Sequence, residues 1–153
     1  MGHQALQRVV VRMMYDASFA NQVIEKGHKA LSGVDLREEE IEWLTLTDAR
    51  AFTTDEHRLD RTLKALIDEY PRSTAIIFRR DANLFGLAEF FTQQEFHDAI
   101  QNRGSLALAF GDYLKRYAGS LEKDLANTVQ IEKVLAELRR ASRTPHAIGG
   151  EYA

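Results

Sequence analysis

The sequence contains no cysteine among its 153 residues, and only two prolines and one tryptophan. Without cysteine the chain forms no disulfide, no thiolate metal site and no cysteine nucleophile, which fits a reducing compartment. It has no run of roughly 18 to 20 apolar residues, the length that a membrane-spanning helix needs. The N-terminus also lacks the charged and apolar segments of a signal peptide. The sequence therefore predicts a cytoplasmic protein that does not contact a membrane.

A strong charge of one sign is missing as well. The chain has 20 Lys and Arg residues against 23 Asp and Glu residues, which gives a net charge of -3. This balance provides no general attraction to nucleic acid or to an anionic membrane. Hydrophobic residues make up 44% of the chain and charged residues 28%, proportions typical of an ordinary globular protein. The length suits one domain with a sizeable core.

Apolar residues recur at helical spacing along most of the chain. The pattern predicts an all-α fold, with one compact domain of six to eight helices over residues 3–141. It is lost at the end of the chain, where a flexible tail is expected over residues 142–153. The expected helices cover residues 3–15, 16–27, 35–46, 53–70, 75–91, 93–102, 105–118 and 120–141.

Several of these helix starts carry capping signals. Asp16 is expected to be the N-cap of the second helix. Pro71 is expected to stop one helix, and Ser73 or Thr74 to cap the next. The acidic run after Asp35 fits a helix start, where negative charge meets the positive end of the helix dipole. Three pairs are expected to form capping boxes: Asp35 with Glu38, Thr53 with Glu56, and Thr92 with Glu95.

The middle of the chain is its most aromatic part, with five of the eight phenylalanines lying between Phe78 and Phe96. Each of these rings, taken alone, favours a place in the core. Phe90, Phe91 and Phe96 cannot all point the same way across a cap at Thr92, so we expect surplus aromatic surface there. Such surface beside polar groups is typical of a protein interface. The predicted partner-binding residues are Phe91, Glu95, Phe96, His97, Arg103, Phe110 and Tyr113.

No set of residues predicts catalysis or metal binding. Glu25 and His28 have the E-x-x-H spacing of di-iron bundles, but such a site needs a second motif and two more carboxylates. Glu56, His57 and Asp60 could form an acid–base cluster, yet a solvated helix start explains them better. A lone histidine beside aromatic residues, such as His97, is typically bonded to the backbone at the edge of the core. We therefore expect no catalytic residue, no metal and no cofactor.

Three arginines, Arg139, Arg140 and Arg143, lie close together near the end of the last predicted helix. Positive charge is favourable at a helix C-terminus, which explains them structurally. The alternative is a patch that binds an acidic partner such as a peptide.

Two segments together resemble a known group of proteins. One runs from Arg8 to Phe19 and continues through the acidic helix at 36–43 and the stretch Leu63-x-x-Leu66-x-x-Glu69-Tyr70-Pro71. The other joins Phe90-Phe91-x-x-x-Glu95-Phe96-His97 to the stretch from Arg103 to Leu114. They resemble the partner proteins of multinuclear non-heme iron oxidative enzymes, which include the methanobactin-type partner subunit. These proteins act in the biosynthesis of ribosomally synthesised, post-translationally modified peptides.

The resemblance implies a subunit that holds no iron and does no chemistry. It would form a heterodimer with a barrel-shaped iron enzyme and help to engage the leader of a precursor peptide, whose core the enzyme oxidises. Members of the group continue into a C-terminal portion with strands, and this sequence shows no strand pattern after residue 142. A weaker resemblance is to the small helical, non-catalytic subunit of ring-opening dioxygenases of the protocatechuate 4,5 type. A free-standing helical interaction module is the remaining alternative.

Overall fold

The structure is a computed structural model, which describes residues 2–53, 56–102, 104–118 and 123–143. These residues are almost entirely helical and include no strand, which confirms the predicted all-α class. There are nine α-helices in this part, one more than the eight ranges predicted, because residues Arg50–Thr53 form a short helix of their own between two of them. They are α1 (Gly2–Tyr15), α2 (Ala17–Lys26), α3 (Glu38–Leu46), α4 (Arg50–Thr53), α5 (Glu56–Glu69), α6 (Pro71–Asp81), α7 (Gln94–Gln101), α8 (Leu106–Ala118) and α9 (Lys123–Arg143). Two 3-10 helices, η1 (Gly27–Lys29) and η2 (Phe85–Thr92), complete the described elements.

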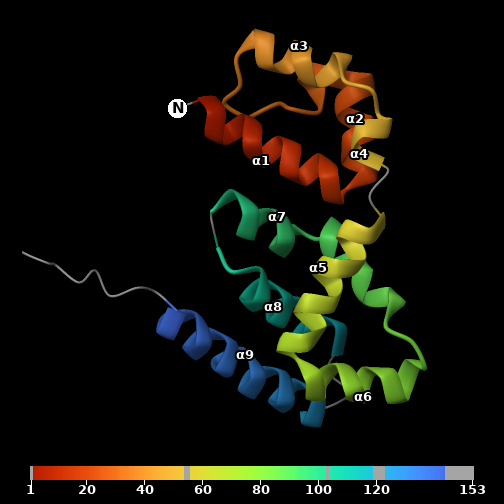
Figure 1. The fold of residues 1–153 in the computed structure, drawn as a ribbon, viewed down its shortest axis with the longest axis vertical. Coiled ribbons are helices and arrows are strands. Elements are labelled where there is room, and N and C mark those ends of the chain that lie inside the picture. Colours follow the sequence, from red (N-terminus) through yellow and green to blue (C-terminus); the bar gives the residue numbers. More distant parts are fainter. Residues whose placement is uncertain (1, 54–55, 103, 119–122, 144–153) are drawn as a thin grey trace, which may run out of the picture.

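Figure 1 shows α1 to α4 gathered at one end of the molecule and α5 to α9 at the other. Each group has its own hydrophobic cluster. The first is built around Met13 and Val23, which are fully buried, and the second around the aromatic residues of the central segment. Helix α7 lies against α1, so the two groups meet there. None of the helices in the described residues has the length and apolarity that a bilayer crossing requires.

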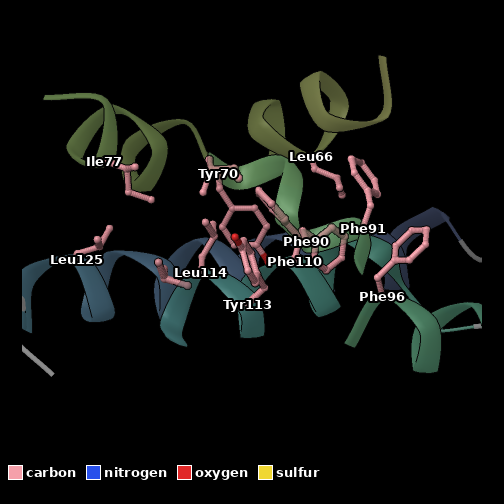
Figure 2. Packing of buried hydrophobic residues seen from close by; sticks show 12 residues of the cluster. Leu66, Tyr70, Ile77, Phe90, Phe91, Phe96, Phe110, Tyr113, Leu114 and Leu125 are labelled. Atoms are coloured by element: carbon pink, nitrogen blue, oxygen red, sulfur yellow. The ribbon is translucent and has the colours of Figure 1, made fainter. Parts of the chain in front are cut away.

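Three rings of the central aromatic segment, those of Phe90, Phe91 and Phe96, are internal. The ring of Phe90 is fully buried, and its centroid lies 5.2 Å from that of Phe110 and 5.5 Å from those of Phe96 and Tyr113. Figure 2 shows these rings meeting from η2, α7 and α8. Aromatic pairs at such separations add roughly 0.5–1.5 kcal/mol each beyond the burial of their area. This cluster is therefore a main source of stability for the second group of helices.

The predicted helix over residues 75–91 is wrong, because it is two elements. Helix α6 already begins at Pro71, whose fixed φ suits the first helical position. It ends at Ala82, a left-handed residue with φ 58° whose N–H donates to the carbonyl of Phe78. The Oδ1 of Asn83 then accepts from the N–H of Phe85 at 3.2 Å, where η2 starts. Neither of the predicted caps, Ser73 and Thr74, begins α6.

A carboxylate from a distant helix caps α6 instead. Glu132 of α9 is 4% exposed. Its Oε1 accepts from the N–H of Arg72 at 2.9 Å, and its Oε2 accepts from the N–H and the hydroxyl of Ser73 at 3.0 and 2.6 Å. The first N–H groups of a helix have no partner within it, and negative charge is favourable there. Glu132 therefore joins the start of α6 to the middle of α9.

The other capping predictions have mixed outcomes. Asp16 is the N-cap of α2 as predicted, since its Oδ1 accepts from the N–H of Phe19 at 2.9 Å. The box at the acidic run lies two residues later than predicted, with Glu40 accepting from the N–H of Arg37 at 2.9 Å. The box at Thr92 is wrong, because that hydroxyl donates to the carbonyl of Glu89. The side chains of Thr53 and Glu56, which the third box needs, lie outside what the structure describes, as does residue 120, where the last helix is expected to start. The predicted tail over 142–153 is described only at residues 142 and 143, which still belong to α9.

Candidate functional site

The predicted partner-binding residues are mostly internal. Phe96 and Phe110 are fully buried, and the other three buried members, Phe91, His97 and Tyr113, are 5% exposed or less. The prediction that these five side chains form a surface is therefore wrong. The premise of surplus rings fails because η2 is packed against α5 and α7, which gives its rings buried neighbours on more than one side. The ring of Phe91, for example, lies 5.3 Å from that of Tyr15 of α1.

The two other members of that set differ. Glu95 is partly exposed at the start of α7, and its carboxylate pairs with the guanidinium of Arg116 at 2.6 Å. Arg103 lies outside the described residues. The predicted patch is thus reduced to one exposed ion pair, which by itself indicates little about binding.

His97 lies in α7 where the two groups of helices meet. Its ring is 4% exposed, and neither ring nitrogen has a hydrogen-bond partner in the described part of the chain, so the expected bond to the backbone is absent. The Nε2 lies 3.5 Å from Oδ2 of Asp16, which is too long for a well-formed hydrogen bond. Burial and the nearby charge of Arg12 lower the pKa of His97, and Asp16 opposes them only in part. The neutral imidazole is therefore the favoured form in the fold.

This lowered pKa predicts that the protein loses stability in mild acid. The unfolded chain takes up the His97 proton near the ordinary pKa of 6.5, while the folded chain takes it up only at a lower pH. The contribution of neutral His97 to the free energy of unfolding is fully present above about pH 6.5 and falls as the pH drops toward the folded-state pKa. Urea unfolding from pH 8 to pH 5 measures it. We expect His97→Gln to flatten the dependence of the free energy of unfolding on pH. The control His57→Gln, which removes an exposed histidine, should leave this dependence unchanged. Equal slopes in all three proteins would contradict the prediction.

A cavity of about 250 Å³ lies beside His97. It is bounded by α1, by the start of α2, by the loop before α3 and by α7. Its polar lining includes Arg12, whose Nε is buried without a hydrogen bond and whose guanidinium carbon lies 3.8 Å from the ring centroid of Phe19. The other side chains that line it are those of Ala5, Arg8, Val9, Val34, Asp35, Ile100 and Gln101.

The residues weighed for metal or acid–base chemistry do not come together. His28 is exposed and its Nε2 lies 2.7 Å from Oε1 of Glu38, which the E-x-x-H motif does not include. Gly27, at φ 47°, breaks the helix between Glu25 and His28. His57 is exposed on α5, and the side chain of Glu56 lies outside the described set. Among the described residues no group of three or more His, Asp and Glu could hold a metal ion.

The three arginines lie on the last turns of α9 and are exposed. Arg139 is held by an ion pair and a hydrogen bond: its Nη1 lies 3.0 Å from Oε2 of Glu69, and its Nε donates to the carbonyl of Leu135. Arg140 and Arg143 occupy the final turn, where positive charge meets the negative end of the helix dipole. The structure thus places all three on the last two turns of one helix, where their positive charges lie close together.

The sequence pattern alone missed the division of α9 into two apolar faces. The inner face contains Leu125, Val129 and Ala136, which are buried together with Glu132. The outer face carries four aliphatic side chains at helical spacing that have no cover: Ile131, Val134, Leu135 and Leu138, which are 63%, 43%, 48% and 61% exposed. The sequence does contain a signal for two faces, because residues 129 and 131 are both apolar, lie about 200° apart on a helix and cannot face the same neighbour.

These four residues define the outer face of α9. Helix α9 lies along the lower edge of the molecule in Figure 1, with α8 above it. A second apolar region lies at the start of η2. There Phe78 and Phe85, which are 53% and 85% exposed, border an open groove that Leu63 and Ile67 of α5 also line. Single exposed apolar residues are common, but four on one helix face form a continuous strip.

Comparisons of the chain with protein-family models, with curated proteins and with solved structures found no match.

Proposed function

We propose that this chain is a non-catalytic partner subunit that pairs with a multinuclear non-heme iron oxidative enzyme. The outer face of α9 supports this proposal most directly. Ile131, Val134, Leu135 and Leu138 repeat at positions i, i+3, i+4 and i+7, the spacing by which an amphipathic helix enters a hydrophobic groove. The resemblance to the partner proteins of such iron enzymes supplies the identity of the protein on the other side.

The physical reason is the cost of leaving this face in water. Each of the four side chains is about half exposed, so covering it contributes on the order of 1 kcal/mol. The inner face of α9 is already used for packing on α8 and α6, which leaves the outer face for a second protein. Monomeric proteins rarely keep continuous apolar strips without such a use.

The same proposal assigns a role to the arginines. Arg139, Arg140 and Arg143 follow directly after Leu138 on α9, so they would border the interface. Guanidinium groups bind carboxylates through paired N–H donors, which suits an acidic stretch of a leader peptide. In this arrangement the partner enzyme carries the iron and oxidises the core of the peptide. This chain contributes only binding surface, and it works in the cytoplasm, where the precursor is made.

A charge placed on the outer face of α9 tests the pairing. We expect Leu138→Glu to weaken co-purification with the proposed partner iron enzyme by at least about tenfold, because it buries an unpaired carboxylate in the interface. The fold should not change, since the side chain is 61% exposed. The control is Ala65→Glu, which adds the same charge at an exposed position of α5.

Two measurements separate the outcomes. Circular dichroism and the melting temperature establish that both variants are folded, and size-exclusion chromatography of the co-expressed proteins measures the complex. If Leu138→Glu and Ala65→Glu both bind as tightly as the unaltered chain, the interface is not on the outer face of α9. If no complex forms with the unaltered chain either, the proposed function is wrong.

A further inference from the structure

The cavity beside His97 is lined by both apolar and polar side chains. The apolar ones come from Ala5 and Val9 of α1, Val34 of the loop before α3 and Ile100 of α7. Its volume of about 250 Å³ is slightly below the roughly 300–1,000 Å³ of pockets that hold drug-sized ligands. A molecule that fits it is therefore small, with an apolar body and one polar group.

The cavity lining includes two hydrogen-bond donors that the described part of the chain leaves without acceptors. They are the Nε of Arg12 and the ring N–H of neutral His97. A buried donor without a partner is unfavourable, so an acceptor in the cavity would be stabilised there. Contact with the ring of Phe19 holds the guanidinium in place, with 3.8 Å between its carbon and the ring centroid. The donors are thus fixed before any ligand arrives.

The charges around the cavity identify the polar group that fits. Asp16 is the nearest carboxylate, but its Oδ1 already accepts from the N–H of Phe19, and its Oδ2 lies closest to His97. Within the described ranges Arg12 makes no ion pair, and burial lowers its pKa. Arg8 and Asp35, which also line the cavity, have opposite charges that offset each other. The charge of Asp16 attracts the partly buried guanidinium of Arg12, but its Nε has no acceptor among the described residues, and a carboxylate best matches such N–H donors.

We propose that this cavity binds a small carboxylate with an apolar body. The carboxylate accepts hydrogen bonds from Arg12 and His97, and the body packs against Val9, Val34 and Ile100. The carboxylate belongs either to a free aliphatic or aromatic acid or to an acidic side chain of a bound peptide, since both present the same group. This site lies on the first group of helices and α7, and it does not depend on the pairing proposed for α9.

Benzoate, propionate and their neutral amides are the probes. We expect millimolar benzoate or propionate to shift the NMR signals of His97 and Ile100, and benzamide and propionamide to leave them unchanged, because the amides lack the charge that Arg12 matches. A blocked glutamate, N-acetyl-glutamate amide, separates the two sources. If it binds more tightly than the free acids, the natural ligand is a peptide side chain; if the free acids bind more tightly, it is a small molecule. Both results support a carboxylate site.

Three variants complete the test. Arg12→Gln should weaken benzoate binding by at least about tenfold, as loss of a charge-assisted contact does. Ala5→Leu fills the cavity without touching its polar groups and should also abolish binding, which keeps the test decisive if Arg12→Gln does not fold. The control Lys29→Gln removes an equal charge from an exposed position and should leave binding unchanged. Equal binding of acids and amides, or undiminished binding by a folded Ala5→Leu or Arg12→Gln chain, would overturn the proposal.

Discussion

Glu132→Ala is expected to reduce the free energy of unfolding by about 3–4 kcal/mol. The substitution leaves the hydroxyl of Ser73 and the N–H groups of Arg72 and Ser73 without their acceptors at the start of α6. Removing the buried charge also removes its desolvation cost, so the lost free energy of unfolding is smaller than the summed contributions of three separate hydrogen bonds to a carboxylate. Urea denaturation measures it, and for a chain of this length the melting temperature should fall by roughly 10 °C.

Two further substitutions make the Glu132 experiment specific. Glu132→Gln keeps one carbonyl oxygen as an acceptor and should cost about 1–2 kcal/mol, between the unaltered chain and the alanine variant. Glu137→Ala removes an exposed glutamate from the same helix and should change stability by no more than about 0.5 kcal/mol. If Glu132→Ala is as mild as Glu137→Ala, the contact does not hold α6 and α9 together.

Glu132 also shows which part of the fold is not readable from the sequence. Its partners Arg72 and Ser73 are 60 and 59 residues away along the chain. From the sequence alone a glutamate in this helix is expected on an exposed polar face, because a charged residue is rarely buried without a partner. The partner is the N-terminus of another helix, so only the packing of α6 on α9 reveals it. The N-cap at Asp16 was predicted correctly because it is local: its carboxylate accepts from the N–H of Phe19, only three residues further along the chain.

The central segment shows a second limit. Its helical period was correct for α7, but η2 is a 3-10 helix with three residues per turn, and a pattern of 3.6 does not describe it. The prediction therefore extended one helix from residue 75 to 91 and moved rings to the surface that are in fact buried. Composition alone correctly indicated that this aromatic segment is the centre of a core.

For the two candidate sites, too, the residues could be identified from the sequence but their arrangement in space could not. The apolar residues of α9 follow the helical spacing that predicts a helix there, but which of them are exposed depends on where α8 and α6 lie. The donors of the cavity could not be paired, because Arg12 and His97 are 85 residues apart and meet only where α7 contacts α1. In both cases the residue types were visible in the sequence, and the tertiary arrangement made them a surface and a cavity.

Gly111→Ala is expected to destabilise the chain by about 2–3 kcal/mol, even though alanine is the better helix former by roughly 1 kcal/mol. A Cβ at this position of α8 would overlap the hydroxyl of Tyr70 and lie 3.0 Å from the ring carbon that carries it. That ring has little freedom to move, since it is fully buried and its hydroxyl donates to the carbonyl of Ala107 at 2.7 Å. The ring must therefore shift and give up this hydrogen bond.

A double-mutant cycle with Tyr70→Phe isolates this contact. Tyr70→Phe alone should cost about 1 kcal/mol, because it loses the bond to Ala107 and keeps the ring. The variant with both substitutions should be more stable, by about 1 kcal/mol or more, than the sum of the single effects predicts, because the overlapping oxygen is gone. Urea denaturation of the four proteins provides the coupling energy. Strict additivity would mean that Gly111 is required for a reason other than its contact with Tyr70.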